Sequence, residues 1–281
     1  MILPQKNIEI GKYWTHSVTL VDGCDRVSPG CDHCWAIPLN ERHEVFAGGE
    51  GEVVFHYEWI EKLMTTRRAK PRVYAIWNDL FHERVTRQDQ LRTLAVMAYQ
   101  RHIYMVLTKR ADRMRTFVNG NVIFGDLLDG NIWLGVTAEN QEWANKRIPP
   151  LVETRAAKRF VSIEPILGSV DLRLKRWVCT QCGDWTPTEA LDDGHHCQCD
   201  FYVEERCKNE LDWVIVGCET GPGARIDDYT TSHIADVVRQ CRGSRVPCWV
   251  KALPVHKKGK WRPSHNMDEW PEFLRVREAP V

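Results

Sequence analysis

The sequence predicts an α/β fold in which β-strands alternate with helices around a parallel sheet. Short apolar runs rich in β-branched and aromatic residues recur along the chain, and the stretches between them have helical spacing or loop composition. Helical spacing is clearest over Gln88–Arg101 and Ser232–Cys241. With 281 residues in all, we expect one domain over 1–281. The seven apolar runs are Ser17–Val21, Val73–Trp77, Ile103–Leu107, Ile132–Val136, Phe160–Ile163, Trp213–Val216 and Cys248–Val250.

Composition and charge are those of an ordinary globular protein. Lys+Arg and Asp+Glu are both 38, so net charge provides no bulk attraction for nucleic acid or anionic membrane. No apolar run approaches the roughly 20 residues of a membrane span, and the first residues lack a signal-peptide pattern. We therefore expect no membrane association and a cytoplasmic location. Eleven cysteines in that compartment favour metal or redox chemistry over disulfides.

Polar or charged residues follow six of the apolar runs almost at once. In a parallel βα barrel the carboxyl ends of the strands form the active-site rim. A charge there is costly unless it is solvated, paired or bound to a ligand. Any one of these residues could be a solvated loop start, but together they predict a common polar mouth. They are Asn78 with Asp79, Lys109, Glu139, Glu164, Glu219 and Lys251.

Three cysteines, Cys24, Cys31 and Cys34, lie on a Gly- and Pro-containing loop directly after the first run. Three thiolates leave one position open in a metal centre that needs four ligands. The spacing alone leaves two interpretations. One is a four-iron cluster with one iron free for a substrate or cofactor. The other is zinc, with His33 or His43 as the fourth ligand.

Six segments make the chain resemble a phage-associated family within the radical S-adenosylmethionine (SAM) superfamily. They occur in the family's order and cover most of the chain from Trp14 to Lys251. The resemblance implies a partial βα barrel of radical SAM type, with a [4Fe–4S] cluster on Cys24, Cys31 and Cys34 and with SAM as cofactor. The segments are TLVDGCDRVSPGCDHCWA, AIWNDLFHE, VLTKR, WLGVTAENQEWANKRIPPL, RFVSIEPILGSVDL and DWVIVGCETGPGAR.

The cysteine spacing departs from that of the wider superfamily, which is C-x3-C-x2-C. Here six residues separate Cys24 from Cys31. The residue before the last cysteine is usually aromatic and lies near the adenine of SAM. In this chain that position is His33, with Trp35 just beyond the last cysteine.

The resemblance also implies a reaction, in which an electron donor reduces the cluster and SAM yields a radical that abstracts a hydrogen atom. The phage association suggests DNA or a modified nucleotide as partner, in the host cytoplasm. The expected step is isomerisation of a glycinyl-type, amino-acid-modified thymidine, as part of DNA hypermodification that protects viral DNA from restriction. Two alternatives remain open. They are another radical SAM reaction, such as repair, methylation or tailoring, and a zinc-only nucleic-acid-binding protein without catalysis.

Strand-end position assigns candidate roles within such a site. Glu219 is the first candidate for the SAM amino group or a substrate amine, followed by Glu164 and Glu139. Candidates to hold a carboxylate or phosphate are Lys109, Arg225 and Lys251.

A second cysteine group lies in an apparent insertion over 176–210. Two close pairs of cysteines predict a zinc-ribbon-like structural site, and a second iron–sulfur cluster is the alternative. Nearby aromatic residues could stack on a base or cover the metal. The expected ligands are Cys179, Cys182, Cys197 and Cys199, with His195, His196 and Cys207 as substitutes. Basic residues that could contact phosphates are Arg67, Arg68, Lys70, Arg72, Lys257, Lys258 and Lys260.

Overall fold

The structure is a computed structural model of the chain. The structure describes residues 3–34, 53–65, 70–121, 130–179, 185–187, 202–206 and 211–280, with backbone only between 175 and 206. In this part of the chain no helix is long and apolar enough to cross a membrane.

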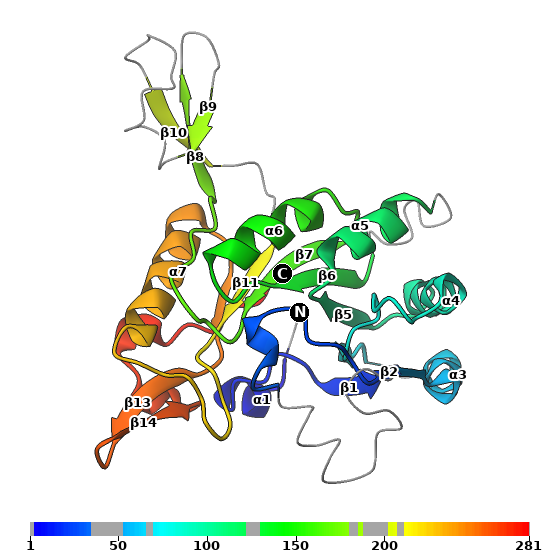
Figure 1. The fold of residues 1–281 in the computed structure, drawn as a ribbon, viewed down its shortest axis with the longest axis horizontal. Coiled ribbons are helices and arrows are strands. Elements are labelled where there is room, and N and C mark those ends of the chain that lie inside the picture. Colours follow the sequence, from blue (N-terminus) through cyan, green and yellow to red (C-terminus); the bar gives the residue numbers. More distant parts are fainter. Residues whose placement is uncertain are drawn as a thin grey trace.

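Seven strands form one fully parallel sheet, as the alternating pattern predicts. Their order is β1-β4-β5-β6-β7-β11-β12, so the strands of this sheet lie side by side in the order in which they occur along the chain. The sheet curls into an open half-barrel (Figure 1). The strands are β1 His16–Thr19, β4 Val73–Trp77, β5 Ile103–Thr108, β6 Ile132–Thr137, β7 Lys158–Ile163, β11 Trp213–Val216 and β12 Cys248–Val250.

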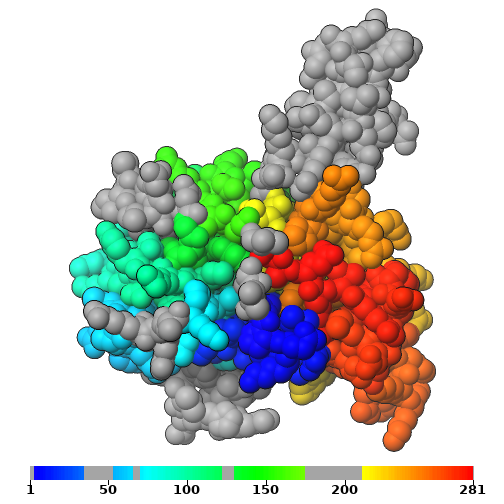
Figure 2. Space-filling view, turned by 180° about the vertical axis from the view of Figure 1, so that it is seen from behind, coloured from blue at the N-terminus to red at the C-terminus, as the bar shows by residue number. Residues whose placement is uncertain are grey.

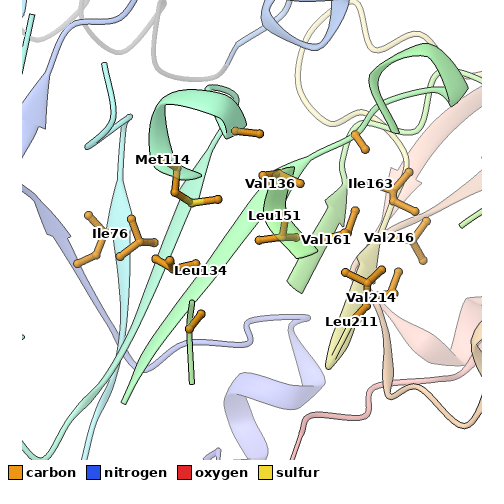
Figure 3. Close-up of a cluster of buried hydrophobic side chains, with 14 of the residues drawn as sticks. Ile76, Met114, Leu134, Val136, Leu151, Val161, Ile163, Leu211, Val214 and Val216 are labelled. Carbon is orange, nitrogen blue, oxygen red and sulfur yellow. The ribbon is translucent and has the colours of Figure 1, made fainter. Parts of the chain in front are cut away.

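Helices connect the strands and cover the convex face of the sheet. Apolar side chains of alternate strand positions, such as Leu134 and Val161, pack there against Met114 and Leu151 of the helices (Figure 3). Thr86 and Asn140 cap two of the helices by accepting a backbone N–H from the first turn. These helices are α3 Tyr57–Thr65, α4 Arg87–Ala98, α5 Ala111–Asn119, α6 Gln141–Val152 and α7 Thr230–Ser244. A further helix, α1 Gln5–Glu9, precedes β1, and its Ile8 packs on the other side of the sheet, against the cluster that includes Trp213 and Trp249.

Aromatic side chains fill the concave side near the amino ends of the strands. Trp213 lies at their centre, with ring centroids 5.5 Å from Tyr13, 6.0 Å from Trp133 and 6.2 Å from Trp249. These rings come from the chain start, β6, β11 and β12, so their convergence requires the sheet to curl. The aromatic packing closes this end, which leaves the carboxyl ends of the strands as the open mouth of the half-barrel.

Three smaller sheets complete the fold. A short ribbon pairs β2 Val21–Asp22 with β3 Val54–Phe55, and a hairpin pairs β13 Leu253–Lys257 with β14 Lys260–Ser264. The third sheet, antiparallel in the order β10-β8-β9, projects from the barrel after β7 (Figure 1). Its strands are β8 Lys175–Cys179, β9 Trp185–Pro187 and β10 Tyr202–Arg206. Single 3₁₀ turns are η1 Pro29–Cys31, η4 Met267–Glu269 and η5 Glu272–Leu274.

The antiparallel sheet β8–β10 lies within the predicted insertion 176–210 and is separate from the parallel sheet. Cys179 is the last residue of β8, and only its backbone is described. The other predicted zinc ligands, Cys182, Cys197 and Cys199, lie outside the described residues, as do His195, His196 and Cys207. The zinc site therefore stays a prediction.

Candidate functional site at the carboxyl ends of the strands

The loop that carries the three cysteines leaves the sheet after β1 and β2. Gly23 begins the loop with a φ of +80°, a backbone conformation that residues other than glycine rarely adopt. The 3₁₀ turn η1 then closes around Cys31, whose N–H donates to Ser28 O at 2.8 Å. Cys31 is buried, whereas Cys24 and Cys34 are partly exposed. The loop is therefore compact, with one buried and two partly exposed cysteines.

The first half of the loop is fixed by residues that follow β4. Asn78 donates from Nδ2 to Val21 O at 2.6 Å, just before the loop begins. His82 is fully buried, and its Nδ1 accepts the N–H of Arg84 at 3.1 Å. The other ring nitrogen, Nε2, therefore donates to Asp25 Oδ2 at 3.2 Å. The strand that leads into the loop and the Asp25 side chain within the loop are both held by residues at this strand end.

Arg110, which follows β5, brings a buried positive charge against the first cysteine. Its guanidinium donates to Asp79 Oδ2 at 2.9 Å and to Glu83 Oε2 at 2.6 Å, and its Nη1 lies 3.8 Å from Cys24 Sγ. Burial would lower the pKa of Arg110, but Asp79 and Glu83 raise it. Burial and Asp79 raise the pKa of Cys24, which Arg110 partly offsets. Asp79 itself also accepts the hydroxyl of Thr108 at 2.6 Å.

Glu139, which follows β6, holds the middle of the loop and is fully buried. Its Oε1 accepts the N–H of Gly30 at 3.1 Å, and its Oε2 accepts Arg147 Nη1 at 2.9 Å. A Cβ on Gly30 would lie 3.2 Å from the carboxyl of Glu139, so a larger residue does not fit without a shift. Arg147 also donates to Thr137 O at 2.9 Å and lies over the Trp143 ring at 4.0 Å. Its Nε and Nη2 are buried without a hydrogen-bond partner among the described residues.

Glu219, which follows β11, fixes the end of the loop through Arg225. Arg225 donates to Glu219 from its backbone N at 2.7 Å, from Nε at 3.0 Å and from Nη2 at 2.6 Å. The same guanidinium reaches Asp32 Oδ2 at 3.1 Å and Pro29 O at 2.9 Å. His33 Nδ1 lies 3.1 Å from Glu219 Oε2. Burial opposes ionisation of Glu219, but the hydrogen bonds from Arg225 lower its pKa overall.

Three charged residues face the concave interior at the mouth. Side chains alternate along a strand, and Met105 and Phe160 belong to the interior cluster. Lys109 and Glu164, each four residues further on, therefore face the same side. Lys251 Nζ lies 3.0 Å from Glu164 Oε1. Lys109 is partly buried and has no ion pair with any residue in the described part of the chain.

The predicted polar mouth is therefore present, with its residues divided between two tasks. Glu139 and Glu219, together with Asn78 and Asp79, hold the loop or the residues beside it. Lys109, Glu164 and Lys251 face the interior. Trp35 and His43 lie outside the described residues.

The loop could hold an iron–sulfur cluster, because such clusters are bound by cysteine thiolates and the loop supplies three thiols. Two guanidiniums, Arg110 beside Cys24 and Arg147 near Cys31, would offset the negative charge of the thiolates. The Arg147 guanidinium interacts electrostatically with Cys31 and carries the two unpartnered nitrogens. Among the described residues no three Cys, His, Asp or Glu side chains already form a ligand group. Cluster loading would therefore require the loop to draw Cys24, Cys31 and Cys34 together.

Four residues at this site were not singled out from the sequence. Arg110 and Arg147 lie next to or near predicted residues. The role of Arg110 depends on its contact with Cys24, 86 residues away in the chain, whereas Arg147 contacts Glu139, eight residues before it. The other two are His82, already described, and His56, whose Nε2 lies 2.6 Å from Asp22 Oδ2. A charged residue directly after a strand was a usable signal only for Arg110, in the run Lys109-Arg110.

Comparison with known families places the chain in one of them. A family model described as protein of unknown function (DUF5131) matches residues 8–272, which is nearly the whole chain. The chain belongs to this family. The match spans the sheet, the cysteine loop and every strand-end residue discussed above. No curated protein and no solved structure matches the chain.

Proposed function

We propose that this member of the DUF5131 family is a radical SAM enzyme whose [4Fe–4S] cluster is held by Cys24, Cys31 and Cys34. One observation carries the proposal: a three-cysteine loop is tied to successive strand ends across the mouth of a parallel half-barrel. When bound, such a cluster would leave one iron for the amino and carboxylate groups of SAM and would supply the electron that cleaves it. The ligand type, the open position and the two buried guanidiniums support this assignment.

The interior-facing residues are the best placed to bind the charged ends of SAM or substrate. Glu164 supplies a carboxylate for an amine, and Lys109 supplies a cation without an internal partner in the described residues. Glu219 was the first candidate for the amine, but Arg225 and His33 already occupy both of its oxygens. We therefore assign Glu219 to positioning the cysteine loop.

We further propose that the reaction is isomerisation of a glycinyl-type thymidine in phage DNA. Removing a hydrogen atom from the glycine α-carbon gives a radical stabilised by its amino and carboxyl substituents. The bond from nitrogen to the thymine methylene carbon then breaks, a bond from the α-carbon to that methylene forms, and the hydrogen atom returns. No oxidant is consumed. Lys109 and Glu164 suit a substrate that carries both a carboxylate and an amine.

For the insertion 176–210 we propose a structural zinc site on Cys179, Cys182, Cys197 and Cys199. The three-stranded antiparallel sheet suits a zinc ribbon, because so small a sheet has little core of its own. Metal analysis distinguishes this site from the loop, because zinc should remain after iron is chelated from the protein.

Anaerobic reconstitution with iron and sulfide tests the cluster. The wild-type protein should become brown and bind close to four irons that are lost in the Cys31→Ala variant. Cys241→Ala is the matched control, since Cys241 is also buried but lies on α7, away from the mouth. Equal iron content in both variants, or a colourless wild-type protein that retains only zinc, would refute the proposal.

A further inference from the structure

The hairpin β13–β14 concentrates positive charge in a protein whose formal net charge is zero. Residues 256–262, His-Lys-Lys-Gly-Lys-Trp-Arg, are all exposed and include four basic side chains and no acidic one. The turn is tight, with φ of +51° at Lys258 and +73° at Gly259. The hairpin projects from the body of the protein, at the lower right in Figure 2.

The register of the hairpin separates its charges from its aromatic rings. Lys257 lies opposite Lys260, and Arg262 lies on the same face, two residues on. The other face carries His256 opposite Trp261, with ring centroids 5.1 Å apart. One face is therefore cationic and the other is aromatic.

The placement of the two lysines is unfavourable for the hairpin on its own. Like charges directly opposite each other destabilise an antiparallel pair. Lys257 is compensated by an ion pair with Glu269. Lys260 and Arg262 have no ion pair with any residue that the structure describes. An anion bound along this face would remove the repulsion.

The hairpin is connected to the mouth through the chain and through a side-chain hydrogen bond. It begins two residues after Lys251, which faces the interior. Trp261 Nε1 donates to Asp228 Oδ1 at 2.9 Å. Asp228 lies three residues after Arg225, which holds the cysteine loop. Tyr229, which follows Asp228 in the chain, is 69% exposed and is a second exposed aromatic side chain.

We propose that the β13–β14 hairpin binds a single-stranded segment of nucleic acid beside the mouth. Lys258, Lys260 and Arg262 contact phosphates, and Trp261 and Tyr229 offer rings to unpaired bases. This combination of a basic track with aromatic platforms is typical of single-strand binding. An enzyme that reacts on a base must take that base out of the duplex, so unpaired nucleotides are expected at the mouth. The identification of the strand as substrate DNA rests on the proposed function, whereas the binding itself does not.

Fluorescence anisotropy with a labelled oligothymidylate tests the proposal on the full chain without any cofactor. The variant is Lys260→Glu with Arg262→Glu. The matched control is Arg101→Glu with Arg155→Glu, which makes the same charge change at exposed residues preceding β5 and β7, at the opposite end of the sheet. We expect the hairpin variant to bind at least about tenfold more weakly, and its log Kd–log salt slope to fall by about 1.4 for two lost phosphate contacts. Trp261→Ala should weaken binding about tenfold without changing this slope.

Three results would overturn the proposal. They are an equal loss of oligonucleotide affinity in the control variant, unchanged affinity in the hairpin variant, and no binding by the wild-type protein at low salt. So would competition by polyglutamate of equal charge as effective as competition by the oligonucleotide itself. SAM cleavage measured without DNA should be the same in the wild-type protein and the hairpin variant. The two proposals can therefore fail separately.

Discussion

The buried ion pair between Arg147 and Glu139 allows the clearest test of how the cysteine loop is held. Both side chains are almost fully buried, and Arg147 Nη1 lies 2.9 Å from Glu139 Oε2. Replacing Arg147 by Met leaves the carboxylate of Glu139 buried without its counter-ion. Breaking a buried pair in this way costs about 3–5 kcal/mol. We expect the lower value of this range, about 3 kcal/mol, because the N–H of Gly30 still donates a hydrogen bond to Glu139 in the variant.

A loss of 3 kcal/mol in the free energy of unfolding lowers Tm by about 6–12 °C in a chain of this class. Urea denaturation of the apoprotein followed by circular dichroism measures it, with an unchanged m value showing that the unfolded state is the same. Lys146→Met is the matched control in the same helix. Lys146 forms an exposed pair with Glu142 at 2.6 Å, for which we expect a cost under about 1 kcal/mol.

A double-mutant cycle then isolates the pair. Glu139→Gln combined with Arg147→Met should be more stable than the sum of the single changes predicts, by about 0.5–3 kcal/mol. The reasoning is wrong if Arg147→Met and Lys146→Met destabilise the protein equally. It is also wrong if the stability losses of Glu139→Gln and Arg147→Met simply add up in the double variant.

Three further changes test other parts of the account. Gly30→Ala places a methyl group against Glu139, so it should lower the free energy of unfolding by about 1–3 kcal/mol. It should also lower iron uptake on reconstitution. Full iron content would show that Glu139 does not hold the loop at Gly30. Asp227 accepts N–H groups of Tyr229 and Thr230 at the start of α7, and a hydrogen bond from the Thr230 hydroxyl lowers its pKa. Its stabilisation is therefore present above the unfolded pKa of about 3.9 and is lost as pH falls through the folded value. In urea titrations, Asp227→Ala should lower the free energy of unfolding by about 0.5–1 kcal/mol at pH 7 and by almost nothing near pH 2. An equal loss at both pH values would contradict this prediction. Lys109→Gln should leave the stability in urea and the iron content unchanged. It should raise the KM for SAM or substrate about tenfold to a hundredfold, because a hydrogen bond to a charged group contributes about 1.5–3 kcal/mol. An unchanged KM would show that Lys109 does not bind either molecule.

Most strands of the half-barrel could be predicted from the sequence because they are short apolar runs, and β6, β11 and β12 are buried along their whole length. The runs at 73–77, 213–216 and 248–250 match β4, β11 and β12 residue for residue. The first run was placed too far along the chain. In the structure β1 ends at Thr19, and Val21 begins the separate strand β2, because it pairs with β3 instead of β4.

The contacts that hold the site could not be predicted in the same way. Gly30 and Glu139 are 109 residues apart, and Pro29 and Arg225 are 196 apart, so nothing in local spacing links them. Strand-end position showed that Glu219 belongs to the mouth. It could not show that Arg225 and His33 occupy its oxygens. The sequence thus predicted which residues gather at the mouth, whereas the division between holding the loop and facing the interior required the structure.

The most direct test of the central claim is SAM cleavage by the reconstituted protein. After anaerobic reconstitution and addition of a strong reductant, the wild-type protein should convert SAM to 5′-deoxyadenosine and methionine, measured by liquid chromatography with mass spectrometry. Cys34→Ala should abolish this product, and Cys241→Ala should retain it. A wild-type protein that binds four irons but yields no 5′-deoxyadenosine under reduction would contradict the account.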